Sequence, residues 1–439
     1  MTSLLGTLVR IHAYGKEMDY VKPFVPQERK ESVGSGTFVT PPLGAVFRPD
    51  ALYILTCAHV IDGADQVSVV LPLRGSEKLE ARVLAFVPRD NYDLAVLELP
   101  NENGMHNPYI HVLPVGKSTA LEPGEKLVAL GFPMAQTGLK VSDGVFAGLE
   151  DYLQHTVSIS PGNSGGPLIN SSGQLIGINN AGLVHVAASN IGYAVPIELY
   201  TLTAPRFFSG ITTIVRQPMF GFLLQPTTKK HLEREAGVVN KTGMYIFDVI
   251  PTSPVAAEVQ AGDFLCEVEN VPVDFQGEIQ VSWSVQKVPL HTVLQRLSDP
   301  SKTYAFTVFR SKTKQWDTVH MSPVEVDLHA SLYRYNPYEH TEYMNIEGFI
   351  LMELCRNHRQ YKELRHAFTE LTVQERFQSH VIITHVVPGS PADVSKTLKD
   401  GDRIVQVNNV PVRTLVEVQR ALSNDNNLLT TSKGKSTVI

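Results

Sequence analysis

The stretch of sequence that decides the fold is Gly162-Asn163-Ser164-Gly165-Gly166-Pro167-Leu168. A serine hydroxyl is a poor nucleophile unless a base lies beside it and N–H donors stabilise the oxyanion that forms. Glycines allow the backbone to turn sharply, so the N–H groups of Gly162 and Ser164 can converge on one point. An ordinary glycine-rich hairpin turn is the alternative, but such a turn does not need Gly-Gly-Pro-Leu before the next strand. We therefore predict that Ser164 is a nucleophile and that these two N–H groups form its oxyanion hole.

A base for this serine is predicted at His59, which ends the strand-like run Leu55-Thr56-Cys57-Ala58-His59. A lone histidine at such a position is more often structural than catalytic. The third partner is expected at Asp93, directly before the apolar residues 94–99, where a carboxylate can accept the imidazole N–H and hold the tautomer that takes the serine proton. Asp90 is the alternative, but a position at the start of a strand favours Asp93.

The three residues follow one another in the order His, Asp, Ser, with separations of 34 and 71 residues. This is the order found in the chymotrypsin fold and not in subtilisin or the α/β-hydrolases. Residues 1–207 agree with it, because they consist of short β-type runs between Gly, Pro and Asn turns. We expect a mostly β fold with a chymotrypsin-like double β-barrel over residues 1–207. Within it, the polar residues 15–32 are predicted to form a long exposed loop between the first two strands.

A second pattern follows this region and occurs twice. Each copy has a Gly-containing loop, a Pro-x-Ser-Pro turn and a Gly-Asp pair in the same order, over roughly a hundred residues, which indicates duplicated modules and not the shorter repeats of a solenoid. The loops are Phe220-Gly221-Phe222-Leu223 and Glu347-Gly348-Phe349-Ile350. We expect two α/β modules, at residues 216–325 and 345–439, joined by a linker over residues 326–344. The second module is predicted to carry a helical insertion over residues 357–376.

Taken together, Gly-Asn-Ser-Gly-Gly-Pro-Leu, Thr-Cys-Ala-His-Val, Asp-Leu-Ala-Val and the two modules resemble the HtrA/Deg family of serine proteases over nearly the whole chain. The layout is most similar to Deg-type members without an export signal. Such a resemblance implies a homo-oligomer, a trimer or a multiple of trimers, formed through the protease domains.

The two trailing modules resemble PDZ domains, in which an extended peptide adds as a strand to the sheet edge and a Gly-containing loop holds its terminal carboxylate. The residues that match this peptide-binding loop are Gly221, Phe222, Gly348, Phe349 and Ile350. For each module, a role in assembly without peptide binding is the alternative.

The segments predicted to form the pocket for the substrate side chain contain no acidic residue, which indicates a preference for small apolar residues before the cut bond. The predicted pocket residues are Ile159, Ile178, Asn179, Asn180 and Ala181. Asn163 stands where digestive relatives carry an Asp that pairs with a freshly cut N-terminal amine. Because a neutral amide cannot make that ion pair, activity is not expected to depend on N-terminal processing.

Composition excludes several other classes of function. The net charge is −6 with no run of Lys and Arg, so nucleic-acid binding is not predicted. No stretch is apolar enough to span a bilayer, and the N-terminus lacks the basic region of a signal peptide. The three scattered cysteines, Cys57, Cys266 and Cys355, argue against a disulfide framework, so we expect an intracellular location, in cytoplasm or nucleus and not a secretory compartment. Cys57 is expected to be a small buried side chain without a redox role, and no metal or cofactor is predicted because no metal-binding motif is present.

The sequence thus predicts a serine endopeptidase that hydrolyses unfolded or tagged proteins through an acyl-enzyme on Ser164, in protein quality control or regulatory proteolysis. Expected partners are these polypeptides, together with C-terminal peptides at the PDZ-like modules. The alternative is a proteolytically weak chaperone or PDZ scaffold that keeps the protease fold.

Overall fold

The computed structural model describes residues 2–16, 18–89, 91–100, 110–180, 191–211, 213–237, 241–251, 253–284, 286–325, 341–372, 375–422, 427–434 and 436–438. The alternative aspartate, Asp90, the predicted pocket residue Ala181 and most of the predicted linker lie outside these residues. The chain forms two compact units. Unit 1 contains Met1–Gly15 and Lys30–Val326, and unit 2 contains Lys16–Arg29 and Asp327–Ile439.

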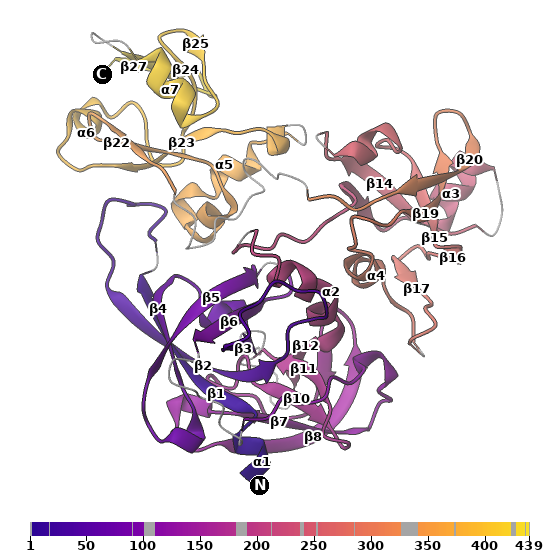
Figure 1. Ribbon diagram of the computed structural model, residues 1–439. Coiled ribbons are helices and arrows are strands. Elements are labelled where there is room, and N and C mark those ends of the chain that lie inside the picture. Colours follow the sequence, from indigo (N-terminus) through magenta and orange to yellow (C-terminus); the bar gives the residue numbers. More distant parts are fainter. Residues whose placement is uncertain are drawn as a thin grey trace. The chain divides into compact units, whose positions relative to one another are not determined.

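Unit 1 begins with two closed six-stranded antiparallel barrels (Figure 1). The strand order of the first barrel is β1-β2-β3-β6-β5-β4, and that of the second is β10-β11-β12-β9-β8-β7. This arrangement confirms the predicted mostly β, double-barrel fold. The strands of the first barrel are β1 (Leu8–Lys16), β2 (Arg29–Val39), β3 (Ala51–Thr56), β4 (Ala64–Val70), β5 (Leu79–Val87) and β6 (Leu94–Pro100). Those of the second are β7 (Lys126–Gly131), β8 (Lys140–Leu149), β9 (Leu153–His155), β10 (Pro167–Asn170), β11 (Leu175–Asn179) and β12 (Gly192–Pro196).

The apolar run that follows Asp93 in the sequence forms strand β6. Its first six residues are all buried, and Val and Leu fit the pleated, crowded surface of a central strand. It pairs with β3 through the register Leu55↔Val96 and with β5 through Val87↔Leu94. Both strands therefore hold the start of β6, and with it the residue that precedes it, in a fixed place. In sequence, helix α1 (Thr2–Leu5) precedes the first strand of this double-barrel region and helix α2 (Ile197–Phe207) follows the last.

The rest of unit 1 is an antiparallel sheet with the order β13-β14-β15-β19-β20, with β16 paired to β15. Three aromatic residues lie in its core: the rings of Phe220 and Phe222 are stacked, and the ring of Phe306 meets both of them edge-on. The strands are β13 (Phe222–Gln225), β14 (Met244–Val249), β15 (Phe264–Val268), β16 (Val271–Pro272), β19 (Tyr304–Arg310) and β20 (Gln315–Met321), with the separate pair β17 (Glu278–Ile279) and β18 (Val288–Pro289). Its helices are α3 (Lys229–Ala236) and α4 (Leu290–Arg296).

Unit 2 contains a second antiparallel sheet with the order β21-β22-β23-β24-β26-β27, with β25 paired to β24. The strands are β21 (Met344–Ile346), β22 (Phe349–Glu353), β23 (Val381–Val386), β24 (Arg403–Val407), β25 (Val410–Pro411), β26 (Leu428–Thr431) and β27 (Ser436–Val438). Its helices are α5 (His366–Thr369), α6 (Pro391–Ser395) and α7 (Leu415–Ala421). The predicted helical insertion contains α5 and the 3₁₀ turns η8 (Arg356–Gln360), η9 (Lys362–Leu364) and η10 (Glu375–Phe377).

The segment between β1 and β2 is a loop, as predicted, but it is not exposed throughout, because Lys16–Arg29 belongs to unit 2. The ring of Tyr20 is only 5% exposed and packs with Met352 and Cys355, while Val21 packs against Leu364 and its neighbours. Polar residues surround these few apolar side chains in sequence. The sequence pattern therefore hid a buried contact that only the tertiary structure reveals.

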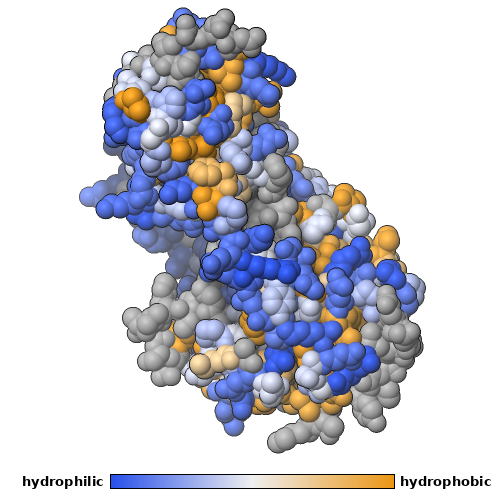
Figure 2. All heavy atoms as spheres, turned by 90° about the vertical axis from the view of Figure 1, so that its left-hand side faces the viewer, coloured by the Kyte–Doolittle hydropathy of each residue, from blue (hydrophilic) through white to orange (hydrophobic). Residues whose placement is uncertain are grey.

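Among the described residues, no helix is both long enough and apolar enough to cross a membrane. In the view of Figure 2, apolar side chains are interspersed among hydrophilic ones and do not form one continuous band.

Candidate active site

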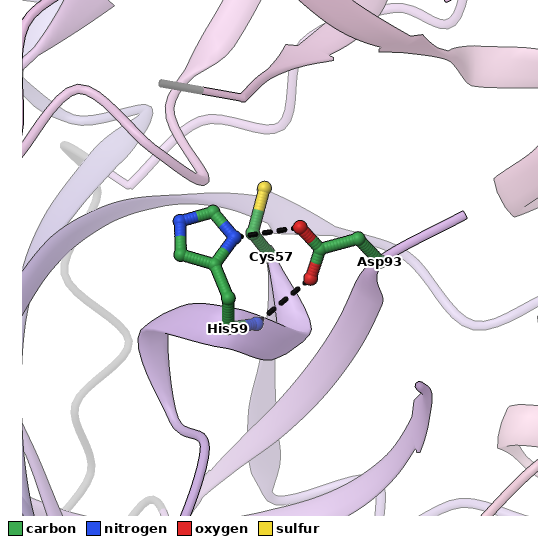
Figure 3. Close-up of side chains that lie close together, drawn as sticks. All are labelled: Cys57, His59 and Asp93. Carbon is green, nitrogen blue, oxygen red and sulfur yellow. Dashed lines mark hydrogen bonds and ion pairs between the residues drawn. The ribbon is translucent and has the colours of Figure 1, made fainter. Parts of the chain in front are cut away.

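Three side chains from the double-barrel region form a continuous chain of hydrogen bonds. The Nε2 atom of His59 lies 2.8 Å from Oγ of Ser164, and its Nδ1 atom lies 2.6 Å from Oδ2 of Asp93. The other carboxylate oxygen, Oδ1, accepts the backbone N–H of His59 at 2.8 Å. Figure 3 shows both oxygens of Asp93 facing His59. The structure thus brings together the three residues that the sequence singled out.

Two of these residues, His59 and Asp93, are placed by the ends of strands. His59 lies in the 3₁₀ turn η1 (Ala58–Val60) directly after β3, and Asp93 immediately precedes β6. Asp93 has a positive φ of 58°, which is uncommon for a residue other than glycine, and its carbonyl accepts the N–H of Ala58 at 3.3 Å. The carboxylate is 1% exposed, whereas the imidazole is 17% exposed. The base can therefore meet a substrate while its carboxylate partner stays shielded from water.

Backbone hydrogen bonds fix the turn that carries Ser164, and its role as an oxyanion hole stays a prediction. The carbonyl of Pro161 accepts the N–H of Met134, and the carbonyl of Asn163 accepts the N–H of Gly166. Because N–H and C=O point in opposite directions across a trans peptide, the N–H groups of Gly162 and Ser164 point away from the donors Met134 and Gly166. Gly162 has φ of 99°, and a Cβ atom there would lie 2.4 Å from the carbonyl oxygen of Phe132. Only glycine fits that position without distortion.

Ser35 on β2 holds this turn from the opposite barrel, and the sequence analysis missed it. Its hydroxyl donates to the carbonyl of Gly162 at 2.7 Å and accepts the N–H of Phe132 at 3.0 Å. Its backbone N–H donates to the carbonyl of Ser164 at 2.8 Å. The flanking glycines in Gly34-Ser35-Gly36 were the available signal, since they mark a strand that another backbone approaches closely.

The predicted pocket residues that the structure describes are largely buried. Ile178, Asn179 and Asn180 are at most 2% exposed, while Ile159 is half-buried against the core of the second barrel. The amide of Asn179 donates to the carbonyl of Pro167 at 3.0 Å, and that of Asn180 donates to Oδ2 of Asp93 at 2.8 Å. These two amides thus bond to the protein, and their lining of a substrate pocket stays a prediction.

Cys57 lies beside the base without entering the hydrogen-bond chain. Its sulfur lies within 4.8 Å of ligand atoms of His59 and Asp93, so the three could be considered as metal ligands. However, the thiol donates to the carbonyl of Asn179, and its complete burial raises the pKa of the Cys57 thiol well above its ordinary value. A metal ligand has to be the thiolate. The local environment therefore favours a protonated thiol over a metal-binding one.

The two Gly-containing loops of the predicted peptide-binding modules are built alike. Gly221 has φ of 77° and Gly348 has φ of 101°. A Cβ atom would come within 2.4 Å of the hydroxyl of Ser253 in the first loop and within 2.1 Å of that of Ser390 in the second. This equivalence supports the predicted duplication. Phe222, Phe349 and Ile350 are all buried, at 9%, 0% and 1% exposure.

The edges of the two sheets differ at the place where a peptide would add. In unit 1, β13 is the terminal strand of its sheet, and no described strand pairs with its outer edge. In unit 2, the corresponding strand β22 is already paired by the chain's own β21, in the register Asn345↔Ile350. A cavity of about 310 Å³ lies between the residues around β21 and helix α7. The edge of the second sheet is therefore filled from within the chain.

Comparisons with known families agree with both parts of this description. Residues 34–178 match the family described as trypsin-like peptidase domain, and residues 382–431 match the PDZ domain family.

Several named proteins are similar to this chain. The serine protease HhoB of Synechocystis sp. is 31% identical over 65% of this chain and 68% of its own length. The periplasmic serine endoprotease DegP of Escherichia coli is 24% identical over 90% of this chain and 75% of its own length. A DegP-like periplasmic serine endoprotease of Halomonas elongata is 28% identical, and the chain spans only 54% of its length. The solved structure of the HtrA-type protease AlgW with a decapeptide has a TM-score of 0.52 and 22% identity, covering 73% of this chain and 95% of that one, which shows a shared fold.

These relatives overturn the expected location in cytoplasm or nucleus, because two of them are named periplasmic endoproteases. The physical reason for the error lies in the cysteines. Cys57, Cys266 and Cys355 are free and at most 2% exposed. A fully buried thiol meets no partner thiol in any compartment, so the absence of a disulfide framework carried no information about location.

Proposed function

Because the chain belongs to the HtrA/Deg family of serine proteases, we propose that it cleaves unfolded or tagged polypeptides in protein quality control or regulatory proteolysis. The observation that carries this proposal is the hydrogen-bond chain from Ser164 through His59 to Asp93, with distances of 2.8 and 2.6 Å. The periplasmic relatives favour substrates in a periplasmic or secretory compartment.

In the proposed mechanism, Oγ of Ser164 attacks the carbonyl carbon of the scissile bond while Nε2 of His59 takes the hydroxyl proton. Asp93 accepts the N–H at Nδ1, which keeps Nε2 free for that proton and stabilises the imidazolium. The N–H groups of Gly162 and Ser164 stabilise the oxyanion. The imidazolium then protonates the leaving amine, and an acyl-enzyme remains on Ser164. Water attacks the ester with His59 again as base, which releases the acid and restores the serine.

We further propose that the first module binds C-terminal peptides through Gly221 and Phe222, since the outer edge of β13 is unpaired among the described strands. The second module is proposed to bind such a peptide only once β21 is displaced, through the residues Gly348, Phe349 and Ile350. A homo-oligomer, either a trimer or a multiple of trimers, is proposed from the family alone.

The proposal is tested by incubating the full chain with reduced, unfolded casein and mapping every product end by mass spectrometry. A serine-directed fluorophosphonate should label Ser164, and labelling and cleavage should both disappear in Ser164→Ala and His59→Ala. We expect cuts after Val, Ala, Ile or Leu, because the described residues of the predicted pocket include no acidic one. Binding of casein without any product would instead support the scaffold alternative, and cuts mainly after Lys or Arg would refute the apolar pocket.

A further inference from the structure

A histidine that the proposed mechanism does not use lies inside the second barrel. His155 is the last residue of β9 and is 0% exposed. Its partner on β12 is Gly192, and in the same register Leu153 pairs with Ala194. Both of these apolar residues belong to the core of the barrel. Because side chains two positions apart on a strand share a face, the ring of His155 lies on the inner face as well.

The ring is a polar group among apolar neighbours. On β8 it is paired with Phe146, which is also buried. Its two nitrogens lie near the backbones of Tyr193 and Val157, but among the described residues neither nitrogen makes a hydrogen bond of ordinary geometry. Burial lowers the pKa of His155 to about 4, so the ring is neutral near pH 7. An unpaired polar group in a core reduces stability, so packing alone favours an apolar residue here.

Strand directions place this ring at the base of the predicted substrate pocket. Strands β9 and β11 are both antiparallel to β12, and they therefore run in the same direction. The predicted pocket residues Ile159 and Asn180, which follow β9 and β11, thus leave the sheet at the same end, on either side of the start of β12. The N–H of Asn180 donates to the carbonyl of Tyr193 at 2.9 Å, which keeps β12 beside this segment. Gly192, the first residue of β12, therefore lies at the floor between the two walls.

The nucleophile lies beside the same end of β11. The N–H of Gly165 donates to the carbonyl of Asn179, and the N–H of Asn179 donates to the carbonyl of Gly166, both at 2.9 Å. These bonds hold the residues directly after Ser164 against the last residue of β11. A peptide whose carbonyl is attacked by Ser164 can therefore direct the side chain before the cut bond into the space above Gly192.

The ring of His155 fills the place that a side chain on the floor would occupy. A Cβ atom on Gly192 would lie 2.3 Å from Cε1 of His155 and 2.7 Å from the carbonyl oxygen of Val157. The ring thus lies where the floor meets the wall that follows β9. We propose that His155 is a specificity-determining residue, whose ring closes the deep end of the pocket and restricts the residue before the cut bond to short side chains such as Ala and Val. The inference rests on the proposed function and names the substrate preference of the same site.

Matched peptides test this role on the full chain. They differ only in the residue before the cut bond, which is Ala, Val, Met or Phe, and kcat/KM is measured for each. The wild type should prefer Val to Met and Phe by about tenfold or more, since one methylene too many in a pocket discriminates by roughly 10- to 200-fold. In His155→Ala the deep end opens, and the Met-to-Val ratio of kcat/KM should rise at least about tenfold. Because both peptides meet the same enzyme preparation, this ratio does not depend on the fraction of folded protein.

Two further variants separate the shape of the ring from its polarity and from loss of folding. His155→Phe keeps a flat ring of similar size and should keep the wild-type ratio. It should also raise the thermal transition, because no polar group is left unpaired in the core. His155→Val leaves a smaller cavity than His155→Ala and should raise the Met-to-Val ratio in the same direction. It decides the question if His155→Ala does not fold.

Failure of this role can be separated from failure of the proposed function. If Ser164→Ala keeps the wild-type rate, the proposed function falls, and the role of His155 falls with it. If Ser164→Ala is inactive but His155→Ala and His155→Val keep the wild-type Met-to-Val ratio, only the role of His155 is overturned. That outcome includes variants that cleave every peptide more slowly by the same factor, as a purely structural residue would. A wild-type preference for Met or Phe over Val overturns the role as well.

Discussion

The backbone N–H of Tyr20 donates a hydrogen bond of 3.1 Å to the hydroxyl of Tyr361, although 341 positions separate the two residues. The ring of Tyr20 also meets that of His358 edge-on, with centroids 5.7 Å apart. Lys16–Arg29 lies between β1 and β2 in sequence, yet it completes the apolar core of unit 2. Unit 2 is therefore built from two stretches that lie far apart in the sequence, Lys16–Arg29 and Asp327–Ile439.

This contact predicts that unit 2 loses stability when the segment is altered. Tyr20→Ala removes a buried aromatic side chain and should destabilise unit 2 by about 3 kcal/mol or more, while Tyr361→Phe removes the hydroxyl that accepts this hydrogen bond and should cost about 1 kcal/mol. Hydrogen exchange on the full chain should show faster exchange in β22 and β23 and unchanged exchange in β3 and β6. The exposed Val25→Ser is the control. Unchanged protection of β22 in Tyr20→Ala would contradict the contact.

A second prediction concerns Ser35, whose hydrogen bonds hold the turn around Gly162. Ser35→Ala removes the hydroxyl that donates to the carbonyl of Gly162 and accepts from Phe132. Loss of an oxyanion-hole donor itself typically costs about 10²- to 10³-fold in kcat, and an indirect support should cost less, about tenfold. We measure kcat per fluorophosphonate-labelled serine, with the exposed Ser172→Ala as control. If Ser35→Ala keeps the wild-type kcat, the turn holds its shape without the hydrogen bonds of the Ser35 hydroxyl.

The sequence could single out Ser164, His59 and Asp93, which the structure brings together, because catalysis restricts residue type and local backbone at once. Ser164 needs its glycines, and His59 and Asp93 sit at the ends of strongly apolar strands. The supporting residues follow no such local rule. Ser35 bonds to Gly162 across 127 positions, and Asn180 bonds to Asp93 across 87. A serine or asparagine is common in loops, so only the closed barrels show which of them face the site.

The same limit explains the segment after β1. Its polar neighbours predict an exposed loop, and the burial of Tyr20 depends on Met352 and Cys355, which lie in a distant module. The strand β21 was likewise absent from the sequence analysis, because three residues before a glycine turn carry no β signal of their own.

Those three residues lead to a third prediction, that the two modules differ in peptide binding. The full chain should bind a fluorescent peptide with an apolar C-terminus at the open edge of β13 and not at β22, which β21 already pairs. Gly221→Ala places a Cβ atom 2.4 Å from the hydroxyl of Ser253 and should weaken binding at least about tenfold, since β-augmentation depends on the intact loop. The matched variant Gly348→Ala should bind as wild type does. Fluorescence anisotropy measures both, and the reverse result would assign the peptide to unit 2.

The last prediction is a loss of stability in mild acid. His358 is fully buried in unit 2, and burial lowers the pKa of His358 to about 4 from an ordinary value of 6.5. Because the folded state disfavours the proton, its contribution to stability is complete above about pH 6.5 and is lost as the pH falls toward 4. A single such histidine changes the free energy of unfolding by about 1.4 kcal/mol per pH unit within that window. Burial also lowers the pKa of His380 in the same unit, so two slopes add. Carboxylates such as Glu375, whose pKa is lowered to about 2 mainly by hydrogen bonds from Thr372, change the stability only below pH 4.5.

We therefore measure exchange-derived stability of β22 and β23 between pH 6.5 and 5. His358→Gln cannot take up the proton and should reduce the slope without abolishing it, whatever its effect on stability at pH 7. An equal slope in the variant and the wild type would show that His358 is not the group that titrates.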